Sequence, residues 1–175
     1  MIDPISQEQR DEVTRETGRY VALASELLDY PFPEVPVHFD LRGRAAGMFK
    51  AHGKRSWLRY NPWIFAKYYD EHFSGTIPHE VAHYIVHELY GYGVKPHGRE
   101  WQGVMALFGA DPGVTFNADL SGVPQRRQRT HPYRCDCREH EVSSTRHNRM
   151  LRGSASYMCR YCNTSLRYSP LAQTV

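Results

Sequence analysis

Two histidines and a glutamate stand at a spacing typical of metal-dependent hydrolysis. Residues 79–83 read HEVAH, so His79 and His83 are four residues apart and Glu80 follows the first histidine. On a helix, residues four apart lie on one face, and both imidazoles can direct a nitrogen at one ion about 2 Å away. Glu80 would lie beside that ion without binding it, where its carboxylate can take a proton from a bound water and pass it to a leaving amine. The spacing predicts a zinc site, and the alternative is a buried, hydrogen-bonded polar face of a helix.

A zinc site of this kind needs a third protein ligand, and three residues that follow are candidates. His87 continues the four-residue spacing, but at 1.5 Å rise per residue it would lie about 12 Å from His79, which is too far for one small ion. His97 and Glu100 come after a turn that begins at Gly91. The residues alone favour His97 only slightly, so both candidates stay open.

All four cysteines of the chain fall within its last 41 residues. Cys159 and Cys162 form a C-x-x-C knuckle, which offers two thiolates to zinc from a tight turn. The opposing pair comes from CDCREH, where Cys135 and Cys137 have a shorter spacing and His140 is an alternative to Cys135. The pattern favours four cysteines around a structural zinc. A redox C-x-x-C is the other chemistry, but no thioredoxin-like βαβ pattern surrounds this one.

Charge divides the chain into an acidic and a basic part. Residues 1–120 carry 12 Lys and Arg against 16 Asp and Glu, for a net −4, whereas residues 121–175 carry 10 Arg, no Lys and 3 acids, for a net +7. The arginine guanidinium is planar and forms paired hydrogen bonds with phosphate. We therefore expect the basic part to contact DNA, with Arg146, Arg149 and Arg152 as candidate contacts. The alternative is a solvated basic face that only aids solubility.

The pattern of apolar residues predicts an α+β fold, in which helices accompany one small antiparallel sheet. Helices are expected over 6–28, from about 61 to a break at 73–76, from 78 to about 90, and over 98–109. Strands are expected within 37–43, 45–53 and 55–62. The segment between the two cysteine pairs is expected to form a small hairpin with exposed arginines. The HEVAH motif therefore falls on a helix, as its chemistry requires.

The length of 175 residues suits one domain with a small appendage. We expect a main domain over 1–120, a basic linker over 121–130 and a zinc module over 131–175 that is too small to fold without its metal. No apolar run approaches the roughly 18 residues of a membrane span, and the polar N-terminus lacks the pattern of a signal peptide. The expected location is the cytoplasm, where cysteines stay reduced, and the default oligomeric state is a monomer.

Several pieces of the chain, taken in order, resemble the SprT family, the bacterial relatives of the Spartan proteases that degrade proteins crosslinked to DNA. These pieces are AAGMF, LRYNP, PHEVAH, PHGREW and the segment from YRCDCREH to YMCRYC. They extend from about residue 36 to the last cysteines, and their joint presence is more specific than HEVAH alone. The resemblance implies a zincin-like metallopeptidase core followed by a zinc ribbon. It also implies that His79, His83 and His97 bind the catalytic zinc and that Glu80 is the catalytic base.

The expected function is zinc-dependent endopeptidase cleavage of DNA-associated or DNA-crosslinked proteins, with the basic zinc ribbon docked on DNA. The expected partners are protein substrates and DNA, and the expected cofactors are two zinc ions, one catalytic and one structural. The alternative from another class is a nucleic-acid or transcription accessory protein without significant peptidase activity. Glu80 argues against it, because a purely structural zinc site has no use for an unligated carboxylate. A third possibility is a peptidase without a nucleic-acid role, in which the positive charge of residues 121–175 would serve only solubility.

Overall fold

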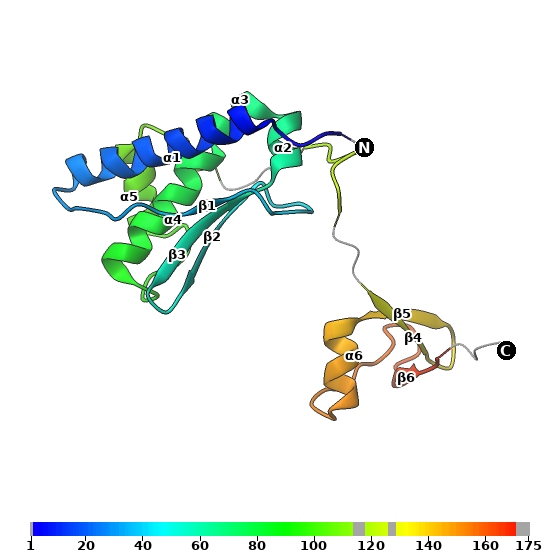
Figure 1. Ribbon diagram of the computed structural model, residues 1–175. Coiled ribbons are helices and arrows are strands. Elements are labelled where there is room, and N and C mark those ends of the chain that lie inside the picture. The colour runs from blue at the N-terminus through cyan, green and yellow to red at the C-terminus, as the bar shows by residue number, and fades with distance from the viewer. Residues whose placement is uncertain (1, 114–117, 126–128, 171–175) are drawn as a thin grey trace. The chain divides into compact units, whose positions relative to one another are not determined.

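The computed structural model describes residues 2–113, 118–125 and 129–170. Packing of Cα atoms divides the chain into two compact units, Met1–Gln125 and Arg126–Val175 (Figure 1). The predicted basic linker over 121–130 spans this division, and its residues 126–128 lie outside the described residues. The described part of the first unit contains α1 (Gln7–Leu27), β1 (Val37–His38), β2 (Gly47–His52), β3 (Arg55–Tyr60), α2 (Pro62–Lys67), α3 (Tyr69–Ser74), α4 (Thr76–Tyr90) and α5 (Arg99–Leu107).

Two helices begin at capping residues, close to the starts that the sequence predicts at 6 and about 61. The Ser6 hydroxyl accepts a hydrogen bond from the Gln9 N–H, and the Gln9 side chain accepts one from the Ser6 N–H, which makes a capping box at the start of α1. The Asn61 side chain accepts from the Ile64 N–H at 3.3 Å, and Pro62 takes the first position of α2. Both helix starts are confirmed, because the signals that set them are local.

Helix α4 carries the HEVAH motif through the middle of the first unit. Gly75 separates it from α3, within the break that the sequence predicts. Its buried apolar residues cover roughly half of the helix surface or somewhat more, and they are Ile77, Pro78, Val81, Ala82, Tyr84, Ile85 and Val86. The other side carries the histidines and Glu80, so the helix has a broad apolar face and a polar stripe. Accordingly α4 packs against α1, α5 and the strands β2 and β3 (Figure 1).

The sheet of the first unit has the strand order β1-β3-β2, so β2 lies at an edge. Strands β2 and β3 are antiparallel, with Phe49 opposite Leu58. One pairing differs from the expected antiparallel sheet, because β1 runs parallel to β3, with Val37 opposite Leu58. The alternation of apolar residues predicts which face of a strand is buried, but it does not predict the direction of the chain. That direction follows from the connection over 39–46, which crosses from one edge of the sheet to the other.

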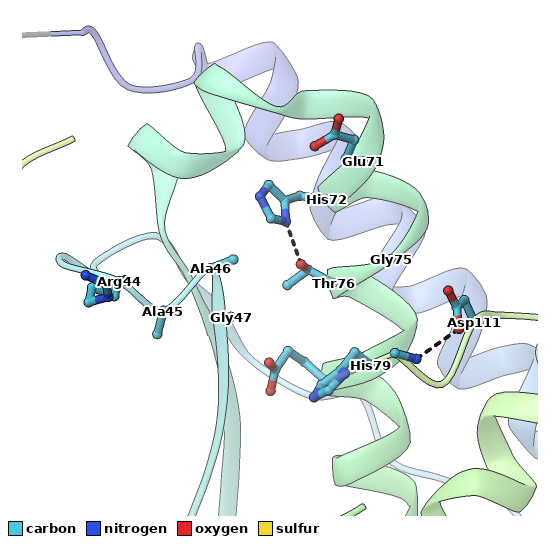
Figure 2. Close-up of a pocket in the computed structure, with 12 residues that line it drawn as sticks. Arg44, Ala45, Ala46, Gly47, Glu71, His72, Gly75, Thr76, His79 and Asp111 are labelled. Carbon is cyan, nitrogen blue, oxygen red and sulfur yellow. Dashed lines mark hydrogen bonds between the residues drawn. The ribbon is translucent and has the colours of Figure 1, made fainter. Parts of the chain in front are cut away.

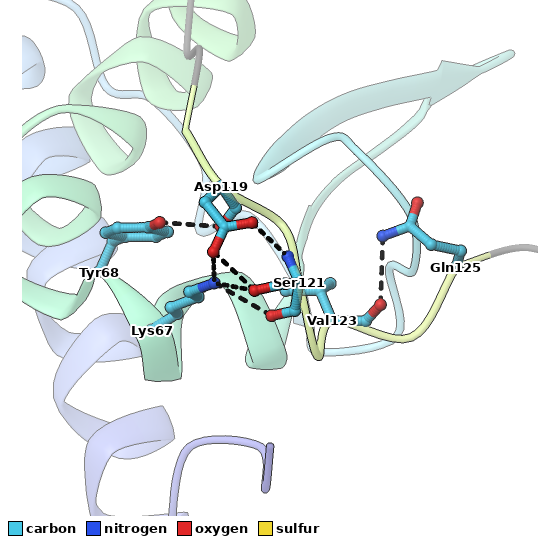
Figure 3. Close-up of polar contacts among 6 residues, drawn as sticks. All are labelled: Lys67, Tyr68, Asp119, Ser121, Val123 and Gln125. Carbon is cyan, nitrogen blue, oxygen red and sulfur yellow. Dashed lines mark hydrogen bonds and ion pairs between the residues drawn. The ribbon is translucent and has the colours of Figure 1, made fainter. Parts of the chain in front are cut away.

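Residues 119–125, which include the first half of the predicted linker, pack on the first unit (Figure 3). The Lys67 ammonium donates to the Asp119 carboxylate at 2.8 Å and to the Ser121 carbonyl at 3.0 Å. The Tyr68 hydroxyl donates to the Asp119 carbonyl at 2.8 Å, and Val123 is buried. These contacts tie the segment to α2 and to the helix start that follows it.

The described part of the second unit, residues 129–170, is a small sheet with one helix. Its described elements are β4 (Thr130–Arg134), β5 (Glu139–Ser143), α6 (Ser144–Leu151) and β6 (Arg167–Tyr168). The strands pair antiparallel in the order β5-β4-β6. None of the described helices, in either unit, is both long and apolar enough to cross a membrane.

The hairpin predicted between the two cysteine pairs is wrong, because this segment forms α6. His147 is buried in α6, and its Nδ1 atom lies 3.0 Å from the Tyr133 hydroxyl, whereas Arg146 and Arg149 are exposed. The ring of His147 also stacks on that of His131, with 3.7 Å between their centroids. The residue that anchors the helix is therefore polar, and a pattern of apolar residues does not reveal it.

Candidate metal centres

The imidazole nitrogens of His79, His83 and His97, here called the histidine triad, converge on one point. Their Nε2 atoms are separated by 3.3 Å (His79 to His83), 3.0 Å (His83 to His97) and 3.1 Å (His97 to His79). Nitrogen ligands at the corners of a tetrahedron around zinc lie roughly 3.3 Å apart, because the Zn–N bond is about 2.0–2.1 Å. The triad could therefore hold one metal ion of this size. Of the two open candidates, His97 belongs to the group, and among the described residues Glu100 does not.

Helix α4 and a tight turn position the triad. His79 and His83 lie one helical turn apart on α4, so they share a face. His97 stands just before α5 with a φ of 57°, a left-handed conformation that is uncommon for a residue with a side chain. The Gly98 N–H closes this turn by donating to the Lys95 carbonyl at 2.9 Å. The turn brings the His97 ring back to α4.

Trp101, on α5, contacts the whole triad and is almost fully buried. Its ring centroid lies 4.8, 5.6 and 4.7 Å from those of His79, His83 and His97, respectively. Its indole N–H donates to the His79 carbonyl at 3.2 Å. No motif in the sequence indicated this contact, and the four-residue spacing from His97 to Trp101 is no helical signal, because His97 precedes α5 in a left-handed turn.

Burial keeps His79 and His83 uncharged. It lowers the pKa of His79 to about 4 and that of His83 to about 3, and repulsion from the neighbouring imidazoles acts in the same direction. Both rings are therefore neutral near pH 7, which is the form that binds metal.

The side chain of Glu80 extends from α4 to the edge strand β2. Its side chain is buried, and its Oε2 atom accepts a hydrogen bond of 2.7 Å from the Phe49 N–H. Burial raises the pKa of Glu80 to about 7, although the Phe49 hydrogen bond opposes the rise. A carboxyl group with a pKa near neutrality can both accept a proton and return it.

Glu80 and His79 line a pocket of about 530 Å³. Residues 44–47, which lead into β2, form one wall, and α3 and the start of α4 form the other (Figure 2). Asp111 also lines the pocket. The buried Asn61 holds the segment that leads into β2, because its side-chain NH₂ donates to the carbonyls of Gly43 and Ala45. The cap of α2 and the wall of the pocket thus depend on one side chain.

The four cysteines, here called the cysteine cluster, are brought together in the second unit. Their Sγ atoms all lie within 4.8 Å of one another, with 3.4 Å between Cys135 and Cys137 and 3.7 Å between Cys137 and Cys159. Sulfur ligands around a tetrahedral zinc lie roughly 3.8 Å apart, because the Zn–S bond is about 2.3 Å. His140 contacts the cluster through Cys135, at 3.2 Å between Nε2 and Sγ. The cluster could hold one metal ion.

Hydrogen bonds favour the thiolate form on the C-x-x-C side of the cluster. The Thr164 hydroxyl and N–H lower the pKa of Cys162 to about 6, and the Cys162 N–H lowers that of Cys159. The pKa of Cys137 is instead raised to about 12, chiefly by its hydrogen bond with Cys135. Thiols this close repel each other once ionised, so a bound cation is needed to keep all four deprotonated.

The candidate DNA contacts of the second unit are exposed. Arg146 and Arg149 lie on α6, and Arg152 follows it directly. The Arg146 guanidinium lies 5.4 Å from the centroid of the Tyr157 ring. The structure therefore places three arginine side chains on and just after one short helix, where a phosphate backbone could reach them.

Comparison with known proteins gives consistent matches along the chain. The model of the SprT-like family matches residues 14–121, a stretch that contains the histidine triad and Glu80. Protein SprT of Vibrio parahaemolyticus is 37% identical over 150 residues, which cover 85% of this chain and 87% of that protein.

Two further relatives show similar values. Protein SprT of Pasteurella multocida is 35% identical over 156 residues, covering 89% of this chain and 91% of the relative. Protein SprT of Erwinia tasmaniensis is 38% identical over 142 residues, covering 80% of this chain and 79% of the relative. No solved structure matches this chain.

Proposed function

The chain belongs to the SprT-like family, and we propose that it is a zinc-dependent endopeptidase that acts on DNA-associated or DNA-crosslinked proteins. The observation that carries the proposal is the convergence of three Nε2 atoms, 3.0–3.3 Å apart, next to the buried carboxylate of Glu80. Zinc held by the histidine triad would supply Lewis-acid chemistry, because it polarises a peptide carbonyl and lowers the pKa of water.

Glu80 supplies the proton transfer that peptide hydrolysis needs. Its Oε2 atom accepts a hydrogen bond from the Phe49 N–H, which holds the carboxylate at the pocket, where it would accept the proton from the attacking water. The same carboxyl then returns the proton to the leaving amine. A pKa of about 7 suits both steps, because neither protonation state is strongly favoured at neutral pH. The substrate peptide would bind in the pocket that Glu80 and His79 line.

The second unit would bind DNA and so bring the enzyme close to its substrates. Four thiolates of the cysteine cluster would hold a second, structural zinc, which stabilises a unit too small to fold on its core alone. Arg146, Arg149 and Arg152 would bind DNA phosphates without reading the base sequence. Proteins trapped on DNA differ widely in sequence, so a tethered enzyme that selects substrates by proximity suits them.

Cleavage of casein and of histones, each with and without DNA, by wild-type protein and Glu80→Gln tests the proposal. The amide keeps the size of the carboxylate but cannot accept the proton, so zinc content should stay unchanged while cleavage falls by about 100- to 10,000-fold. Equal cleavage by both proteins would remove Glu80 from the mechanism. Absence of cleavage by the zinc-loaded wild type with all four combinations would favour an accessory protein that binds nucleic acid.

A further inference from the structure

Strand β2 contacts the candidate general base through its backbone. Because β2 lies at the edge of the sheet, some of its N–H groups point away from β3 and have no strand partner. The Phe49 N–H is one of them, and it donates to Glu80 Oε2 at 2.7 Å. A short hydrogen bond to a carboxylate is strong and directional, so it fixes one oxygen of Glu80 relative to the strand.

Gly47 lies two residues before Phe49, on the same side of β2, and its missing side chain leaves the space that Glu80 fills. A Cβ atom added at Gly47 would lie 2.6 Å from Glu80 Cγ, 2.7 Å from Glu80 Oε1 and 2.6 Å from Thr76 Cγ2. Contacts under 3.0 Å are essentially never made by real Cβ atoms, so these neighbours would have to move. Gly47 does not have a positive φ. Glycine is therefore required here by space and not by the conformation of the backbone.

We infer that Gly47 and the Phe49 N–H together position the Glu80 carboxylate. The hydrogen bond fixes Oε2, and the absence of a Cβ at position 47 lets Cγ and Oε1 lie against the strand, at the edge of the pocket. Gly47 is in this sense a positioning residue, which acts through Glu80. Its effect on the rate rests on the proposed function, whereas its contact with Glu80 does not.

The size of the effect follows from the overlap. An added Cβ would approach Glu80 and Thr76 to 2.6 Å, where ordinary contact begins at 3.4 Å, so the carboxylate must shift by on the order of 1 Å. Misplacement of a catalytic group by about 1 Å can cost about 100-fold in rate. The closest neighbours of the added atom belong to Glu80 and Thr76 and not to the histidine triad, so zinc should stay bound.

The test compares wild-type protein, Gly47→Ala and the matched control Gly18→Ala, whose added Cβ meets nothing within 4 Å. Three quantities are measured: kcat on a peptide substrate, zinc content, and the amide proton shift of Phe49 by NMR. Gly47→Ala should lower kcat by about 100-fold, keep its zinc, and move the Phe49 amide upfield, because the hydrogen bond to the carboxylate lengthens. Gly18→Ala should leave all three as in the wild type.

A second variant separates crowding from general damage. Adding Thr76→Ser to Gly47→Ala removes the Cγ2 methyl and keeps the hydroxyl, so it should restore part of the lost kcat. An unchanged kcat and Phe49 resonance in Gly47→Ala would overturn the inference, and so would loss of zinc together with activity. If Gly47→Ala does not fold, Glu80→Ala decides, because an unmoved Phe49 amide there would mean that no such hydrogen bond exists.

Failure of the proposed function has a different signature. If Glu80→Gln cleaves protein as fast as the wild type, Glu80 is not the base. The Phe49 resonance in Gly47→Ala still reports whether Gly47 positions the carboxylate, because this measurement does not depend on catalysis.

Discussion

The Trp101 ring stands nearly perpendicular to the His97 ring, at 79° and with 4.7 Å between the centroids. The same indole contacts the other two members of the histidine triad and donates its N–H to the His79 carbonyl. Trp101 lies in the first turn of α5, and His97 lies just before this helix. The buried side chain of Trp101 therefore fixes the position of the His97 imidazole relative to the two imidazoles on α4.

We expect Trp101→Phe to weaken zinc binding about 10- to 100-fold, because residues that orient metal ligands typically contribute this much to affinity. Phenylalanine keeps an aromatic ring but loses the N–H that bonds the His79 carbonyl. Competition with a chromophoric chelator measures the change. Trp63→Phe, at a partly buried tryptophan of α2, is the control, and equal affinities for the two variants would contradict the prediction. The harsher Trp101→Ala should also lower the free energy of unfolding by about 3–5 kcal/mol.

The assignment of the third ligand leads to a paired prediction. His97→Ala should remove zinc from the first unit, because two imidazoles alone do not complete a site with three protein ligands. Glu100→Ala should leave zinc bound, since Glu100 lies outside the triad. Zinc per chain, measured by elemental analysis after dialysis, distinguishes the two variants. The reverse result would make Glu100 the ligand.

The fourth ligand in the second unit leads to a similar pair of predictions. We expect the wild type to carry two zinc ions and Cys135→Ala to carry one, because the cluster would lose one of its four thiolates. His140→Ala should keep both ions, since His140 contacts the cluster only through Cys135 among the four sulfurs. Loss of the second ion should also broaden or collapse the NMR signals of the second unit, because such small units fold with their metal. If His140→Ala loses the ion and Cys135→Ala keeps it, the histidine is the fourth ligand.

The features that the sequence predicts well are set by neighbouring residues. Ser6 and Asn61 cap helices through atoms three residues away or fewer, so the pattern of residue types contains the whole interaction. His79 and His83 are likewise placed on one face by the helix itself. His97 needed the family resemblance, because its approach depends on a left-handed turn that no local rule requires of a histidine.

Other features depend on contacts between distant parts of the chain. Gly47 and Phe49 meet Glu80 only because β2 packs against α4, and neither residue type alone indicates such a role. The hairpin predicted for the segment that forms α6 was wrong for a related reason. The helix is held by His147, which is buried and contacts Tyr133 on β4. A pattern of apolar residues does not predict a polar contact of this kind.

The arginines of the second unit lead to a prediction on DNA binding. If Arg146, Arg149 and Arg152 bind phosphates, affinity should fall steeply with salt, because each neutralised phosphate contributes about −0.9 to the slope of log affinity against log salt. Replacing all three with alanine should make the slope shallower by up to about 2.7. Binding should weaken about equally for all DNA sequences, since phosphate contacts do not read bases. Fluorescence anisotropy at several salt concentrations measures both quantities.

A control triple variant separates these contacts from the loss of net charge. Arg15, Lys54 and Arg55 are exposed residues of the first unit, and replacing them with alanine removes the same charge. This control should keep most of the salt dependence, and both triple variants should still cleave a small free peptide, because none of the six residues lines the pocket beside Glu80. Equal slopes for the two variants would assign DNA binding to overall charge. An affinity that is weak and independent of salt in the wild type would leave the basic charge of residues 121–175 without a role in DNA binding.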